Sequence, residues 1–204
     1  MIDGRFIFLI ISVIFGFISP AIGIYSIVKG EFRPQRMTRF LIFLLGLLFV
    51  GTLLAQGDKN SIFIAVTQLI GSTIILLLSI KKGIGGYGKF DILIFCMAMA
   101  SLAVWKTTNN PTLGLIMSIF TDLMAMTPTL IKTWKLPHTE EWKFYMSDVM
   151  ASLFSILSIS LFSIENLAFP LYIFIINTVS VVMILGRKRF LGSGNILFKR
   201  AGVK

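Results

Sequence analysis

The chain has 204 residues, of which 56% are hydrophobic and 14% are charged, whereas about a quarter of the residues in a soluble domain carry charge. The net charge of +10 comes from 19 basic and 9 acidic residues. The basic residues form short clusters between apolar runs, which excludes a soluble nucleic-acid-binding protein and indicates loops that face anionic lipid. The single cysteine, Cys96, excludes a disulfide framework and a cysteine-based metal site.

Seven apolar segments follow one another along the chain, each close to the roughly 20 residues that cross a bilayer as a helix. The weakest boundary between them is a short turn around Glu165 and Asn166, and a basic tail follows the last segment from Arg187. We therefore expect an all-α integral membrane protein with seven transmembrane helices. The segments run over 5–29, 38–56, 61–81, 90–106, 112–134, 145–164 and 167–186.

Lysine and arginine are distributed unevenly over the two sides that these segments define. One side holds 16 of the 19 basic residues, and the other holds Arg5, Lys59 and Lys106. Short loops rich in Lys and Arg stay in the cytoplasm. The distribution predicts an outside N-terminus and an inside C-terminus. The stretch 121–142 resembles a group of bacterial membrane proteins of this size, which implies a multi-pass protein of a bacterial inner (cytoplasmic) membrane.

Segments one to three and five to seven share a pattern. Pro20 and Pro128 interrupt the first segment of each group, 108 positions apart, and a basic loop then leads to the second segment. Two groups of three segments in the same orientation require one more span between them. We expect a first three-helix repeat, a linker helix, a parallel second repeat and a basic cytoplasmic tail, over 1–82, 83–110, 111–189 and 190–204.

Seven spans, an outside N-terminus and a proline in the first helix of each repeat resemble the superfamily of SWEET sugar transporters, PQ-loop proteins and PnuC-type vitamin transporters. The resemblance covers the architecture of nearly the whole chain. Ala21 and Thr129 follow the two prolines, where PQ-loop proteins have glutamine, and segments two and six lack the prolines of SWEET proteins. The resemblance implies transport of a small polar solute such as a sugar or vitamin and leaves the subfamily open.

Asp122 lies about ten residues into the fifth segment, next to Thr121. An ionisable group at membrane depth is costly, so Asp122 is predicted to bind a solute or proton; a structural ion pair or helix–helix hydrogen bond is the alternative. The position of Asp148, near the start of segment six, favours a role as a helix cap or at a helix interface. Asp91 opens segment four, where the helix dipole favours a negative charge. Lys132 lies close enough to the inner surface for its ammonium group to reach the water.

Two amides, Gln68 and Asn177, lie near the middle of the third helix of each repeat, with Ser72 one turn after Gln68. Amides both donate and accept hydrogen bonds, which suits a polar solute, although interhelical bonding explains them equally well. The resemblance to SWEET proteins implies contact with the solute, because an Asn from each corresponding helix meets the sugar there. Trp105 ends segment four, where an interface anchor is favoured over stacking on a solute.

Pro20 and Pro128 each remove a helical hydrogen bond, so matched hinges or static bends are expected at these positions. We predict a transporter, facilitated or cation-coupled, with a non-transporting receptor or scaffold as the alternative. An enzyme is not expected, because the only histidine, His138, lies in a loop and no catalytic set falls within a span. No cofactor or metal is predicted. The expected partners are lipid and a small polar solute, and a homo-oligomer is left open.

Overall fold

The structure, a computed structural model, describes residues 4–85 and 88–200, which form α-helices and one short 3-10 helix, η1. An isolated parallel bridge joins Gln35 to Ile84, and no β-strand occurs within these ranges. The predicted all-α class is confirmed. The helices are α1 (Gly4–Lys29), α2 (Arg36–Gln56), α3 (Ser61–Lys82), α4 (Lys89–Thr108), α5 (Pro111–Lys135), η1 (Pro137–Thr139), α6 (Trp142–Ser158) and α7 (Ile164–Arg200).

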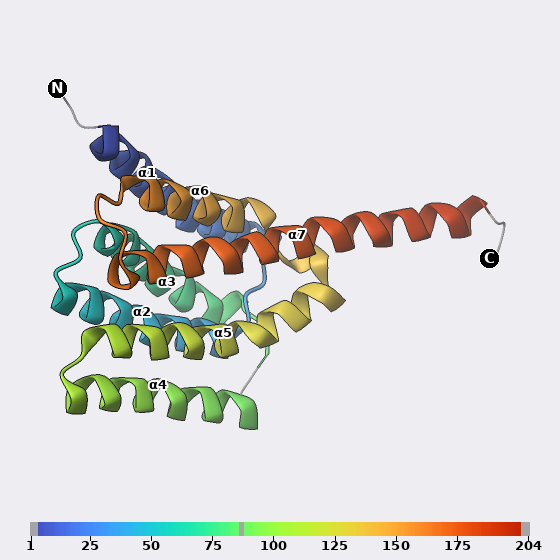
Figure 1. Ribbon diagram of the computed structural model, residues 1–204. Coiled ribbons are helices and arrows are strands. Elements are labelled where there is room, and N and C mark those ends of the chain that lie inside the picture. The colour runs from blue at the N-terminus through green and yellow to red at the C-terminus, as the bar shows by residue number, and fades with distance from the viewer. Residues whose placement is uncertain (1–3, 86–87, 201–204) are drawn as a thin grey trace.

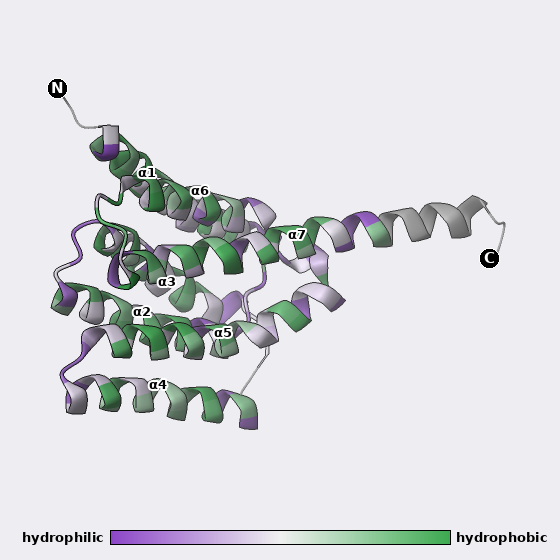
Figure 2. Ribbon diagram, in the orientation of Figure 1, coloured by the Kyte–Doolittle hydropathy of each residue, from purple (hydrophilic) through white to green (hydrophobic). Residues whose placement is uncertain are grey.

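Six of these helices are long and apolar enough to cross a bilayer, namely α1 to α5 and the Ile164–Phe190 part of α7. Hydrophobic residues predominate along these helices (Figure 2), and many of their large apolar side chains are exposed, among them Phe6 and Leu77. Water would solvate such a surface poorly, whereas lipid tails match it. The chain is a multi-pass membrane protein. The sixth helix, α6, has 17 residues and spans about 25 Å.

The predicted boundaries of the last two segments are wrong. The sixth helix begins at Trp142, because the Glu141 side chain accepts a hydrogen bond from the Lys143 N–H and caps it, and it ends at Ser158. Glu165 and Asn166 lie in the first turn of α7 instead of in a loop. Hydropathy misassigned this region because the non-helical segment 159–163 is largely apolar. Helix α7 continues through the first part of the expected basic tail, to Arg200, and projects from the bundle (Figure 1).

The helices pack in a regular scheme of neighbours. Within the group α1–α3, helix α3 contacts both α1 and α2; within the group α5–α7, helix α7 contacts both α5 and α6 (Figure 1). Between the groups, α1 packs on α6 and α2 packs on α5. Helix α4 lies outside, against α5 and α2. Segments far apart in sequence therefore enclose one shared interior.

The α1 face that meets α3 and α6 consists mainly of small residues. Ser12 and Ser19 donate hydrogen bonds to the backbone oxygens of Ala151 (2.7 Å) and Phe144 (3.2 Å) of α6. A Cβ at Gly16 would lie 2.5 Å from the Thr67 hydroxyl of α3. These small side chains recur every four and three residues in turn, so they lie on one face of the helix. In lipid, where the hydrophobic effect does not drive helices together, such a face lets them approach closely. The buried small residues are Ser12, Gly16, Ser19, Gly23 and Ser26.

Replacing Gly71 by Ala is expected to destabilise the fold by about 1–3 kcal/mol, since the new Cβ would overlap the rigid Pro20 ring. The matched control is Gly186→Ala in α7, where nothing lies within 4 Å of the added Cβ. That variant should keep or slightly raise stability, because Ala favours helix over Gly. Unfolding by SDS titration measures both, and equal stabilities of the two variants would contradict close α1–α3 packing.

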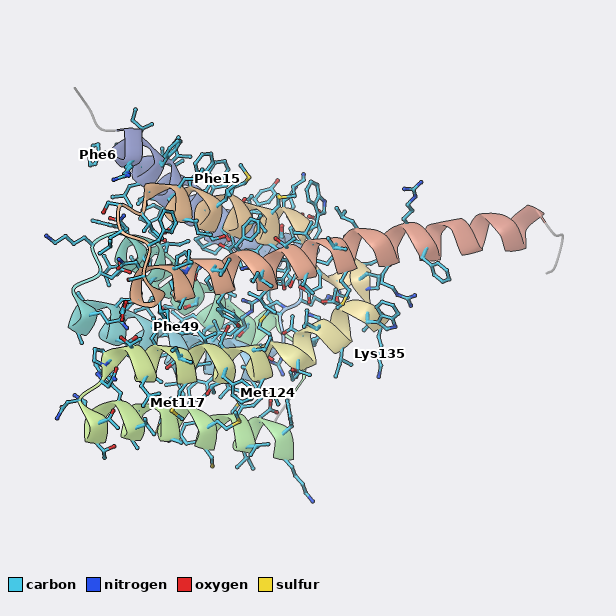
Figure 3. The ribbon with its side chains drawn as sticks, in the orientation of Figure 1. Phe6, Phe15, Phe49, Met117, Met124 and Lys135 are labelled. Carbon is cyan, nitrogen blue, oxygen red and sulfur yellow. The ribbon has the colours of Figure 1, made fainter. Side chains whose placement is uncertain are left out.

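The loops gather at two opposite ends of the bundle. The connections 30–35, 83–85 and 136–141 meet at what we call the basic end, where Arg33 N–H donates to Thr139 O (3.2 Å) and Ile84 N–H donates to Pro34 O (3.0 Å). Figure 3 places Lys135 at this end. The connections 57–60, 109–110 and 159–163 lie at the opposite end, where the Asn60 side chain donates to Ser158 O (2.8 Å).

Candidate functional site

A cavity of about 90 Å³ lies between the two groups of helices, and α1, α2, α3, α5, α6 and α7 all line it. By volume it has room for about three water molecules. Helix α4 contributes nothing to its lining. Its polar lining residues are Ser19, Arg39, Gln68, Ser72, Asp122, Tyr145, Asp148 and Asn177.

Asp122 lies near the middle of α5 and faces the cavity with 7% of its surface exposed. The Tyr172 hydroxyl of α7 donates a hydrogen bond to its Oδ2. One such donor uses only part of the acceptor capacity of a carboxylate. Asp122 therefore joins α5 to α7 and still offers acceptors to the cavity.

Asp148 also lines the cavity, where the sequence favoured a cap or interface role. It is buried in the second turn of α6, and Ser19 of α1 and Gln68 of α3 are its polar neighbours. The helix begins earlier than predicted, so the cap position belongs to Glu141. Asp148 is thus a second buried carboxyl group on the same hollow.

Arg39 is a site residue that the sequence did not single out, because it counts there only as one of the 16 basic residues on one side of the membrane. It lies one turn into α2, lines the cavity and is 6% exposed. The rings of Phe32 and Phe144 lie 5.4 Å and 5.5 Å from its guanidinium carbon and hold it by cation–π contact. Ile42, three residues on, lines the cavity from the same face of α2, but no signal in the sequence separates Arg39 from the basic residues beside it.

The two predicted amides both line the cavity, from α3 and α7. The Asn177 side-chain N–H donates to Ile173 O one turn earlier (2.9 Å), which leaves its Oδ1 as an acceptor. Ser72 lines the cavity next to them, with its hydroxyl donated to Leu69 O (3.0 Å). The structure therefore brings Asp122, Gln68, Ser72 and Asn177 together, as a shared binding site requires.

Three other predicted residues lie elsewhere. The Thr121 hydroxyl is 3.2 Å from the Ser101 hydroxyl and joins α5 to α4. Trp105 packs closely against Gly114 of α5, where an added Cβ would lie 2.7 Å from the Trp105 Cβ. Neither residue is part of the cavity lining. Pro20 borders the cavity, whereas Pro128 faces a separate groove on the outside of α5, so the two prolines are not in matching environments.

A polar network closes the basic end of the cavity. The Glu140 side chain is fully buried, pairs with Lys132 (2.5 Å) and accepts a hydrogen bond from the Tyr145 hydroxyl (2.8 Å). Lys132 also donates to Arg33 O (2.6 Å), and Lys188 of α7 donates to Glu140 O (3.1 Å). Tyr145 also lines the cavity, so this network joins the basic end of the cavity to α5, α6, α7 and the loop 30–35.

An aromatic pair lies toward the opposite end. Phe49 of α2 and Phe169 of α7 have ring centroids 4.8 Å apart, and Figure 3 labels Phe49 inside the bundle. Both rings border a smaller cavity of about 60 Å³, which shares Gln68 and Asp122 with the main one. The aromatic pair therefore stands between the polar site and the opposite end.

Removing the Phe49 ring is expected to open the site toward the opposite end. A reporter cysteine at Ser72, in a Cys96→Ala background, should react about tenfold faster with an impermeant maleimide once Phe49 is Ala, because the cavity left behind admits water. Phe63→Ala on the exposed face of α3 is the control and should leave the rate unchanged. Equal labelling rates in both variants would show that the pair does not close the site.

Comparisons with protein-family models, curated proteins and solved structures find no match to this chain. The function is therefore inferred from the residues that line the cavity. Among the described residues, no group of three His, Cys, Asp or Glu side chains lies close enough to hold a metal ion.

Proposed function

We propose that the chain is a membrane transporter of a small polar solute, built like SWEET, PQ-loop and PnuC-type carriers. In this proposal α1–α3 and α5–α7 are two parallel three-helix repeats, α4 is the linker, and all seven helices span the membrane. The equivalent contacts of α3 and α7 within their groups, and of α1 with α6 and α2 with α5 between groups, support this plan. The basic end is the cytoplasmic end.

The cavity is the observation that carries the proposal. Six helices from both groups contribute to it, and it holds carboxyl, guanidinium, amide and hydroxyl groups between helices whose outer faces are apolar. Such groups are expensive at membrane depth and mark solute or ion pathways. A protein that served only as a scaffold would be better stabilised by apolar packing at this position.

The two closures suggest how the site is reached from each side. The pair of Phe49 and Phe169 separates it from the opposite end, and the Glu140 network separates it from the basic end. Rocking of the two groups against each other would open one closure while the other stays shut. Asp122 would bind a proton, a cation or a polar group of the solute, and Gln68 and Asn177 would hold the solute. Pro20, at the cavity wall, would serve as a hinge.

Uptake into liposomes tests the proposal. A thermal-shift screen of sugars, nucleosides, vitamins and amino acids selects solutes that stabilise the purified protein, and their radiolabelled forms are then offered to proteoliposomes. We expect saturable, protein-dependent uptake of at least one. Saturable binding without flux would identify a receptor instead, and the transport proposal would fail.

A further inference from the structure

Three ionisable side chains share the cavity without contacting one another as ion pairs. Arg39 comes from α2, Asp122 from α5 and Asp148 from α6. The guanidinium interacts with both carboxyl groups at longer range, but neither lies within 4.0 Å of it as an ion pair. Opposite charges therefore border the same hollow with space between them.

The guanidinium keeps donors free for a ligand. Phe32 and Phe144 lie against Arg39 through their rings, which accept no ordinary hydrogen bond. Its polar neighbour is Tyr145, whose hydroxyl hydrogen is given to Glu140. Arginine has five N–H donors in a planar fork that fits an oxyanion, so most of them remain for the contents of the cavity.

The carboxyl groups keep acceptors free in the same way. Asp122 receives one hydrogen bond, from Tyr172, and Asp148 has Ser19 and Gln68 as neighbours. Each carboxylate can accept about four hydrogen bonds. An ammonium group, with three donors, can use this capacity and compensate one of the two negative charges, while Arg39 at longer range opposes the other.

We propose that the solute is a small zwitterion, whose oxyanion binds Arg39 and whose ammonium group binds Asp122 and Asp148. This inference rests on the proposed transport function. A neutral polyol would bring no opposite charge to any of the three groups, and a singly charged solute would serve groups of one sign only, which is costly in a site of low dielectric constant. The volume of about 90 Å³ also favours a solute of few atoms over a sugar or vitamin.

The test compares zwitterions with analogues that lack one charge. Melting temperatures of the detergent-purified chain are measured with the twenty common amino acids, β-alanine, γ-aminobutyrate and taurine. Propionate and ethylammonium are the analogues of alanine that carry only one of its charges, and for any other zwitterion the corresponding analogues are used. We expect saturable stabilisation by at least one zwitterion and none by its analogues. Stabilisation by no zwitterion, or equally by a neutral sugar or a single-charge analogue, overturns the inference.

The Arg39 variants locate the oxyanion. Arg39→Gln should weaken binding of the stabilising zwitterion about tenfold or more, and Arg39→Lys by less, because Lys keeps the charge but loses the fork. Arg33→Gln in the exposed loop is the matched control and should bind as wild type. If Arg39→Gln does not fold, Arg39→Lys decides: unchanged affinity there contradicts the assignment.

The same measurements separate this inference from the transport proposal. Zwitterion binding without flux into liposomes would sink transport and leave the ligand class standing. Uptake of a neutral sugar would support transport and sink the ligand class.

Discussion

Replacing Asp122 by Asn is expected to reduce solute uptake into liposomes at least tenfold while the protein stays folded. Asn has the same shape and its oxygen can accept the Tyr172 hydroxyl bond, so α5 and α7 stay joined. What is lost is the negative charge facing the cavity. A hydrogen bond to a charged group contributes about 1.5–3 kcal/mol, which corresponds to roughly 10–150-fold in affinity. Initial uptake rates and melting temperatures measure the two effects.

The control for Asp122 is Glu31→Gln, which removes one negative charge from an exposed loop. It should transport at the wild-type rate. If Asp122→Asn also transports normally, Asp122 serves only as a structural link between α5 and α7. A large drop in melting temperature for Asp122→Asn would lead to the same conclusion.

Replacing Glu140 by Ala is expected to destabilise the protein by about 3–5 kcal/mol, because the ammonium of Lys132 would be left largely buried without its ion-pair partner. The Tyr145 hydroxyl would lose its acceptor as well. Unfolding by SDS titration measures the loss. The neighbouring Glu141→Gln is the control, and its cost should stay within about 1 kcal/mol because Gln can still cap α6.

A double variant separates the ion pair from other effects of Glu140. Lys132→Met combined with Glu140→Gln removes both charges, so it should recover more than half of the stability lost in Glu140→Ala. The same double variant also removes the ion pair that closes the basic end of the cavity. A reporter cysteine at Ser72 should therefore react faster with thiol reagents. If the double variant loses as much stability as Lys132→Met and Glu140→Gln lose together, the pair is not coupled.

Much of the helix arrangement could be predicted because hydropathy acts locally. A run of roughly 20 apolar residues has to be helical in lipid, since no water is there to bind its backbone. The prediction failed where this signal is ambiguous. The non-helical segment 159–163 is largely apolar, and the basic residues after Gly186 extend α7 instead of ending it.

The candidate site could be predicted only where a polar residue interrupts an apolar run. Asp122, Gln68 and Asn177 stand out in this way, and the structure brings them to one cavity. Arg39 and Asp148 lie among polar residues near helix ends, so nothing local separates them from surface charges. Thr121 and Trp105 have suitable chemistry but lie on helix faces that meet α4 or its neighbours.

Composition and hydropathy were enough to predict an all-α, multi-pass membrane protein and to single out Asp122 and the two amides. The packing of the helices was needed to show that Arg39 and Asp148 face the same cavity and that Glu140 and Phe49 lie at its two sides. The physical reason is the range of the forces involved. Transfer into lipid depends on each segment's own composition, whereas the burial of a charge depends on which helix faces meet across the bundle.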